Sequence, residues 1–201
     1  MGKIFSICGI ILLVGCATQS LIYDISLVEV EMPASVKERY GELKIERIEE
    51  EGISKYLFQN DAFQIFWIVT GELLLFELTN KTSYTIKIIW DEGAYVDENG
   101  KSHNIVESKI RFRDIGRPQV PSVIPGKASL KGAILPSDYI SSPEEIRPLF
   151  KLFPDLYPTG RKELIEEQKE IIGKTIKLLL PIQIEEVVNE YIFIFKINDI
   201  K

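Results

Sequence analysis

The stretch Tyr191-Ile192-Phe193-Ile194-Phe195-Lys196-Ile197 decides the fold class of this chain. Side chains alternate between the two faces of a β-strand, so Tyr191, Phe193, Phe195 and Ile197 share one apolar face. Similar short segments recur from residue 41 onward, separated by Gly, Pro, Asn and Asp. This spacing predicts an all-β antiparallel sandwich. The predicted strands are residues 42–49, 63–69, 72–79, 85–90 (with Ile86, Ile88 and Trp90 facing the core), 94–96, 104–106, 109–113, 129–135, 175–184 and 191–197.

Two of these strands, residues 63–69 and 72–79, are apolar on both faces. In the first of them, Phe66 and Ile68 face away from the remaining aromatic and aliphatic side chains. A strand of this kind needs cover on both sides. The cover could come from the N-terminal leader, from the segment after Pro136 or from a partner protein.

Two dipeptides predict tight turns between strands. Asn99-Gly100 can supply two adjacent positive φ angles, as a two-residue hairpin requires. Pro125-Gly126 pairs a fixed φ with a permissive residue, as in a type II turn.

Between residues 137 and 173 the pattern becomes helical, which predicts a short helical insertion. Ser142-Pro143-Glu144-Glu145 matches a capping box with proline at the first helical position, and Pro148 ends that helix. A second helix is predicted from Arg161 to Ile172, with Gly173 as its stop. Its apolar face comprises Leu164, Ile165, Gln168, Ile171 and Ile172.

The N-terminus has the pattern of a signal peptide with cysteine at the processing point. Lys3 precedes an apolar run from Ile4 to Val14, which is too short to span a bilayer as a helix. The run ends in Leu13-Val14-Gly15-Cys16, which resembles the lipobox of bacterial lipoproteins. The resemblance implies that residues 1–15 are removed, with Leu13, Val14 and Gly15 recognised by the peptidase, and that Cys16 is acylated. Residues 16–40 would form the tether, and residues 41–201 one folded domain.

A different lipidation pattern overlaps the same segment. Residues 1–6, Met-Gly-Lys-Ile-Phe-Ser, match the N-myristoylation pattern, and Cys8 or Cys16 could then be palmitoylated. That alternative describes a dually acylated cytosolic eukaryotic protein. Only in a eukaryotic host would Asn80-Lys81-Thr82 matter as an N-glycosylation sequon.

Composition excludes several classes of function. The sequence has two cysteines, and the lipoprotein interpretation leaves none free in the domain, so disulfides and thiolate metal sites are not expected. Without Lys3, 23 basic residues (24 − 1) face 30 acidic residues, a net charge of −7. Such an acidic domain is not expected to bind nucleic acid.

Several motifs together resemble a group of bacterial lipoproteins with an immunoglobulin-like sandwich domain. They are residues 78–82 running into 86–88, the turn segment 96–103, the segment 123–126, and the late runs 173–175 and 180–182. The resemblance covers residues 56–135 and 173–198, and it implies fold and location but no catalytic residues. Ala17 follows the lipidated cysteine where inner-membrane lipoproteins carry Asp. In a host with two membranes, this implies the outer membrane, with the domain facing the periplasm.

His103, the only histidine, lies just after the Asn99-Gly100 turn and is expected to be exposed. No cysteine nucleophile or Gly-x-Ser-x-Gly motif accompanies it, which argues against a role as general base. Four nearby acids, together with Asn99, could form a weak calcium site, although their spacing differs from that of an EF-hand. A solvated acidic edge is the alternative. These acids are Asp91, Glu92, Asp97 and Glu98.

Lys109, Arg111 and Arg113 share one face of a predicted strand, either as a solvated face or as a site for a small anionic ligand. We expect a non-enzymatic binding or assembly module without a cofactor. It would contact the membrane through Cys16 and could bind an envelope protein. The alternative is a hydrolase that uses carboxylates or a Ser/Lys pair on the 137–173 insertion. A pocket near Arg113, Asp138 or Arg147 would favour the hydrolase, and an apolar patch would favour a partner surface.

Overall fold

The computed structural model describes residues 21–50, 52–150 and 161–201. The predicted signal peptide, its recognition residues, Cys16 and the first part of the predicted tether lie outside these ranges. Within the described ranges, no helix has both the length and the apolar character needed to cross a bilayer.

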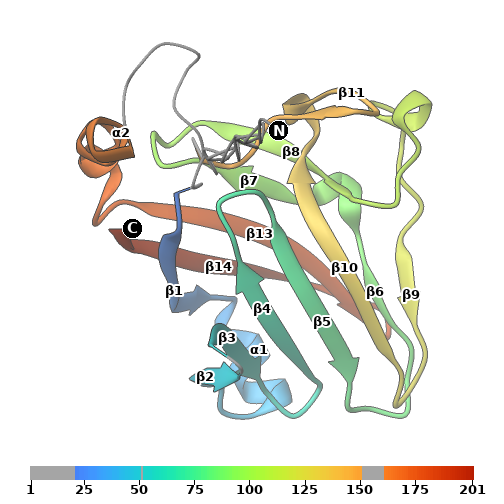
Figure 1. Cartoon of the computed structure of the whole chain (residues 1–201). Coiled ribbons are helices and arrows are strands. Elements are labelled where there is room, and N and C mark those ends of the chain that lie inside the picture. The colour runs from blue at the N-terminus through green and yellow to red at the C-terminus, as the bar shows by residue number, and fades with distance from the viewer. Residues whose placement is uncertain (1–20, 51, 151–160) are drawn as a thin grey trace, which may run out of the picture.

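The chain is mostly β, as predicted, and its strands are antiparallel to their neighbours (Figure 1). The strands are β1 (Tyr23–Glu31), β2 (Lys44–Glu50), β3 (Ile53–Gln59), β4 (Phe63–Val69), β5 (Leu74–Asn80), β6 (Ile86–Ile88), β7 (Ala94–Val96), β8 (Ser102–Glu107), β9 (Ser122–Ile124), β10 (Ser129–Pro136), β11 (Ile140–Ser142), β12 (Glu145–Ile146), β13 (Thr175–Ile184) and β14 (Val187–Ile200). The helices are α1 (Ala34–Tyr40) and α2 (Arg161–Gln168), with short 3₁₀ turns η1 (Trp90–Glu92), η2 (Phe112–Asp114), η3 (Ser137–Tyr139) and η4 (Lys169–Ile171).

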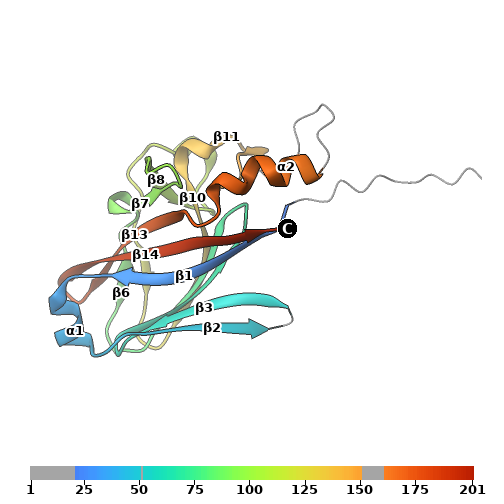
Figure 2. The same cartoon turned by 90° about the vertical axis from the view of Figure 1, so that its left-hand side faces the viewer.

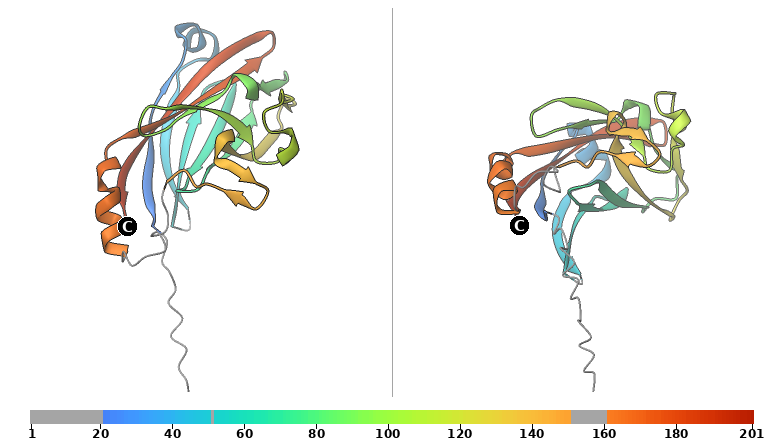
Figure 3. Two further views of the ribbon diagram at one scale, coloured as in Figure 1. Left: turned by 90° about the horizontal axis from the view of Figure 1, so that it is seen from above. Right: turned by 45° about the horizontal axis from the view of Figure 1, so that its top comes forward.

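One hydrogen-bonded sheet carries most of the strands, in the order β1-β14-β13-β7-β8-β10-β5-β4-β3-β2. The sheet curls into a near-barrel whose edge strands are β1 and β2 (Figure 3). An immunoglobulin-like sandwich is not confirmed, because β7 and β8 bridge β13 to β10 and so join what would be two separate sheets.

The barrel does not close between its two edge strands. Helix α1 connects β1 to β2 at one end of the molecule, and the strands diverge toward the other end (Figure 2). That open end holds the start of β1, the β2–β3 turn and the C-terminus.

The predicted core residues of the last strand are fully buried in the interior of the near-barrel. Phe193 of β14 lies across the interior from β3 and β4. Its ring centroid is 5.6 Å from that of Phe58 and 5.0 Å from that of Trp67. The predicted inward side chains Ile86, Ile88 and Trp90 are also buried.

The described part of the predicted tether, residues 21–40, was expected to pack only partly on the domain, and it forms β1 and α1. β1 pairs with β14 from Tyr23 opposite Ile200 to Glu31 opposite Ile192. The pairing shifts register twice: the first shift skips Asn198 on β14, and the second leaves Val28 of β1 unpaired, which breaks the period of two after Leu27.

The predicted strand 109–113 is also wrong, because the chain there forms turns and η2. Gly116 and Pro118 follow this segment, and none of the described strands pairs with residues 109–113. In contrast, β3 was not predicted. It pairs with β2 and β4 and contributes Tyr56 and Phe58 to the core.

Both predicted turns form, but each has a different conformation from the predicted one. At Asn99-Gly100 only Gly100 has a positive φ (81°), and its N–H donates to Asp97 O, which gives a longer, bulged hairpin loop. In the other turn Lys127 has the positive φ (63°). Gly126 is needed there because a Cβ atom would lie 2.6 Å from the carbonyl oxygen of Ser83.

The insertion contains one of the two predicted helices. Residues 142–145 form the turn between β11 and β12, because proline after serine also suits the second position of a β-turn. The second helix forms as α2 and η4, and Leu164 and Ile171 are buried. Ile172 has left the helix and is 37% exposed, which corrects its predicted place on the apolar face.

Candidate functional site

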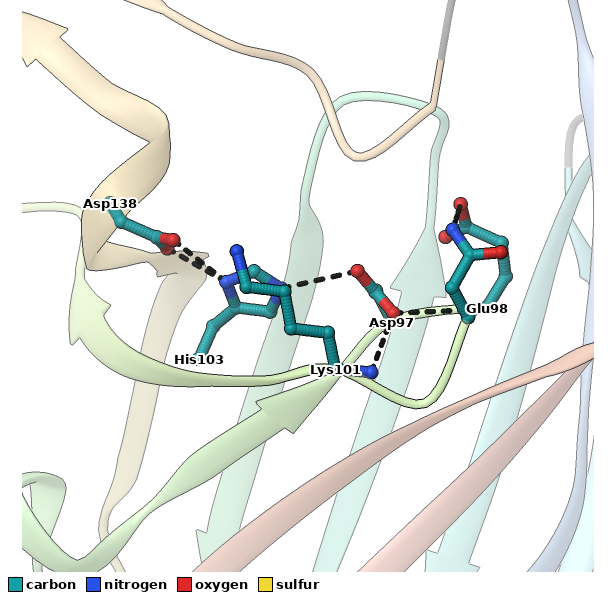
Figure 4. Close-up of polar contacts among 6 residues, drawn as sticks. Asp97, Glu98, Lys101, His103 and Asp138 are labelled. Carbon is teal, nitrogen blue, oxygen red and sulfur yellow. Dashed lines mark hydrogen bonds and ion pairs between the residues drawn. The ribbon is translucent and has the colours of Figure 1, made fainter.

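The most polar buried site surrounds His103 on β8 and is called here the histidine cluster (Asp97, His103 and Asp138; Figure 4). His103 Nδ1 lies 2.8 Å from Asp138 Oδ2, and Nε2 lies 3.2 Å from Asp97 Oδ2. Asp97 begins the β7–β8 loop, and Asp138 is on η3. Both ring nitrogens can donate together only when the imidazole is protonated.

The β7–β8 loop positions Asp97. Its Oδ1 accepts hydrogen bonds from the backbone N–H groups of Asn99 and Lys101, both at 2.9 Å. Burial disfavours the charged carboxylate, but the hydrogen bonds from Lys101, His103 and Asn99 outweigh it. They hold the pKa of Asp97 below its ordinary value.

Aromatic side chains surround the histidine ring. The ring of Tyr139 packs edge-on at 5.1 Å, and the guanidinium carbon of Arg147 lies 4.0 Å from the Tyr139 centroid. Burial raises the pKa of the Tyr139 phenol, and that of Tyr95 further still. The cluster thus joins the β7–β8 hairpin to η3 through a dry, aromatic environment.

His103 was expected to be exposed, and it is only 6% exposed. The strand begins at Ser102, earlier than predicted, so His103 shares the inward face with Ile105 opposite Tyr95. None of the three cluster side chains lines the described pockets discussed below. The contacts of the buried His103 ring with both carboxylates join the β7–β8 loop to η3 and form a structural clamp.

We expect Asp97→Asn to lower the free energy of unfolding by about 1–3 kcal/mol at pH 7, since an amide NH₂ would face His103 or the loop N–H groups. The matched change Asp138→Asn affects a half-exposed carboxylate and should cost less. Because the folded pKa of Asp97 is lowered, its stabilisation is complete above the unfolded pKa of about 4. This stabilisation is lost as the pH falls through the folded pKa of Asp97. The unaltered chain and Asp97→Asn should therefore show the same stability in urea unfolding only at acidic pH. Equal stabilities of the unaltered chain and of Asp97→Asn at pH 7 would contradict the role of the histidine cluster as a structural clamp.

The calcium prediction finds no support, because no group of three potential ligands is arranged for a metal within the described residues. Asp91 instead accepts from the N–H of Gln119 at 2.8 Å, and Glu98 accepts from the Asn99 amide. The basic residues 109, 111 and 113 do not share a strand face, since the strand does not form; Lys109 Nζ donates to Lys131 O at 3.1 Å.

Of the three residues that would have supported a hydrolase, Asp138 and Arg147 both lie beside Tyr139, since Asp138 precedes it on η3 and the guanidinium of Arg147 stacks on its ring. Arg147 lines a pocket with Glu98 and Phe150, and neither Arg113 nor Asp138 lines it. Arg113 is exposed beside Asp114.

The outward face of the sheet carries an apolar groove of about 700 Å³, called here the outer groove (Ile48, Phe66, Ile68 and Leu75). These side chains come from β2, β4 and β5. Two ion pairs flank the groove, Lys55 with Glu50 and Lys131 with Glu77. Phe66 and Ile68 are half-buried and Leu75 is 37% exposed, so the described elements leave this face partly uncovered.

A second cavity of about 640 Å³, called here the mouth cleft, opens where β1 and β2 diverge. Its lining includes residues 21–25, both ends of the β2–β3 turn and residues 68–72. The sequence did not identify it, because its walls come from segments that meet only through the curl of the sheet.

The comparison with known proteins finds no matching family model, no matching curated protein and no matching solved structure.

Proposed function

We propose that this chain is a bacterial envelope lipoprotein, anchored through acyl chains on Cys16, that acts as a non-catalytic binding module for a protein partner. The lipobox resemblance at residues 13–16 supports the anchor, and the resemblance to immunoglobulin-like lipoproteins supports the same location. In a host with two membranes we propose the outer membrane, facing the periplasm.

The outer groove is the observation that carries the binding role. Strand alternation places Phe66, Ile68 and Leu75 on the outward face, opposite a core that is already filled by Ile65 and Trp67. Exposed apolar side chains that adjoin one another and have a polar rim are typical of interaction surfaces. The groove suits a protein segment that presents aliphatic or aromatic side chains between the two ion pairs.

The sequence left three alternatives for what covers the outward face of β4 and β5. The described residues of the 137–173 insertion do not cover it. Leu149 and Phe150 pack instead at the open end, where their N–H groups donate to Glu72 O and Gly71 O. We propose that a partner protein covers this face. The hydrolase alternative has weaker support, since Asp138 does not line the pocket that Arg147 and Glu98 share.

A photoreactive residue at position 75 of the lipidated full-length chain tests this proposal in native envelopes. We expect it to crosslink one protein that is not crosslinked from position 120, which is 85% exposed and is not part of the groove lining. Leu75→Asp should weaken binding of that purified protein about tenfold or more, the effect of roughly 1.4 kcal/mol. Val120→Asp should leave the affinity unchanged. Equal effects of the two substitutions, or no crosslink at position 75, would refute the groove as the binding surface.

A further inference from the structure

We infer that the mouth cleft holds one of the acyl chains attached to Cys16. This inference rests on the proposed lipid anchor. It goes further by assigning a hydrocarbon ligand to a cavity in the folded domain.

Aliphatic side chains form part of the wall of the cleft, beside charged and polar ones. Leu21 precedes β1 and Ile25 lies on it, Ile53 comes from β3, and Ile68 and Val69 come from the end of β4. Ile53 is 49% exposed and its neighbour in the cleft, Ile22, is 62% exposed. The volume of about 640 Å³ lies within the roughly 300–1,000 Å³ typical of small-molecule sites.

The anchor point lies within reach of the cleft. Cys16 precedes Leu21 by five residues, which span at most about 18 Å when fully extended. A chain attached to the Cys16 thiol or amine therefore stays close to the cavity, and the covalent link gives it a high effective concentration there.

The charges around the cleft favour a neutral hydrocarbon over a whole anionic phospholipid. Asp24, Glu49 and Glu72 outnumber Arg47 and Lys201 in the lining. Arg47 is already engaged, since its Nε donates to Glu49 at 2.6 Å and its Nη2 to Ser54 at 3.0 Å. A phosphate group would meet a net negative rim, whereas an acyl chain meets the aliphatic part of the wall and carries no charge.

The test is metabolic labelling with a diazirine-bearing palmitate, followed by irradiation of membranes and of the same purified full-length protein after detergent removal. Peptide mapping should show label on Cys16 and a crosslink from the Cys16 peptide to Ile53 or Val69. The double variant Ile22→Asp with Ile53→Asp changes two exposed side chains and should reduce this crosslink about tenfold, the effect of about 1.4 kcal/mol. The matched control Val120→Asp with Val123→Asp places two acids on exposed valines elsewhere and should retain it.

The outcomes separate the inference from the proposed anchor. A Cys16 that carries the label but shows no crosslink to the cleft in either preparation overturns the inference and leaves the anchor intact. A cleft crosslink that persists in Cys16→Ala assigns the site to a free lipid chain and also overturns the inference. If Cys16 takes up no label, both the proposed lipid anchor and the acyl chain in the mouth cleft are refuted.

Discussion

Cys16→Ala is expected to lose palmitate label entirely and to leave the carbonate-washed membrane fraction, in which the unaltered chain remains. One acyl chain gives only reversible binding, with an association constant of about 10⁴ M⁻¹, whereas two or more chains hold a protein on a membrane. The apolar run before Cys16 cannot replace them, since it is shorter than the roughly 20 residues that a membrane-spanning helix needs. The measurement is label uptake and fractionation of both chains in the native host.

Cys8→Ala is the matched control, because it changes the other cysteine of the same segment. If residues 1–15 are removed, Cys8→Ala should keep full label and membrane association. Under the myristoylation alternative, Gly2→Ala would abolish acylation of the N-terminus and Cys8→Ala could reduce palmitate uptake. Cys16→Ala that retains both label and membrane association would disprove the lipoprotein proposal.

Strands whose alternation runs without interruption were predictable from sequence. β4, β7 and β13 have the predicted bounds, and the aromatic residues of β14 are buried as expected. β1 escaped prediction because its alternation runs only from Tyr23 to Leu27 before the bulge at Val28 interrupts it. The near-barrel escaped it for a different reason, since sheet order depends on long-range pairing through β7 and β8.

The candidate sites also differ in how far local sequence patterns could predict them. The sequence identified the outer groove indirectly, through apolar side chains on both faces of residues 63–69 and 72–79. It could not show which side would stay uncovered, because cover depends on where the insertion packs. The histidine cluster joins residues up to 41 positions apart, and no local pattern indicates that His103 and Asp138 meet.

Asn80 shows how a correct motif can have another role. The sequence marked Asn80-Lys81-Thr82 as a strand end and as a sequon. In the structure Asn80 is fully buried, and its Nδ2 donates to Tyr84 O at 2.6 Å and to Ile124 O at 3.1 Å. This amide holds two loops together and is not presented for glycosylation.

Phe193→Ala is expected to lower the free energy of unfolding by about 3–5 kcal/mol, the range for a large aromatic side chain removed from a packed core. Phe193 is fully buried at the centre of the near-barrel and contacts the rings of Phe58 and Trp67. Total stability for a domain is about 5–15 kcal/mol, so this loss is a large part of it. Urea unfolding of the full-length chain, followed by tryptophan fluorescence, measures the difference.

Phe112→Ala is the matched control, because it removes the same side chain from η2, where Phe112 is 44% exposed. Its cost should stay within about 0.5 kcal/mol. Similar losses for the two substitutions would mean that β14 does not pack against β3 and β4 across the interior. That packing fills the interior of the near-barrel, and strand alternation places Phe66 and Ile68 on the opposite, outward face of β4. A destabilised Phe193→Ala chain should therefore also lose the position-75 crosslink before it unfolds globally, whereas Phe112→Ala should keep it.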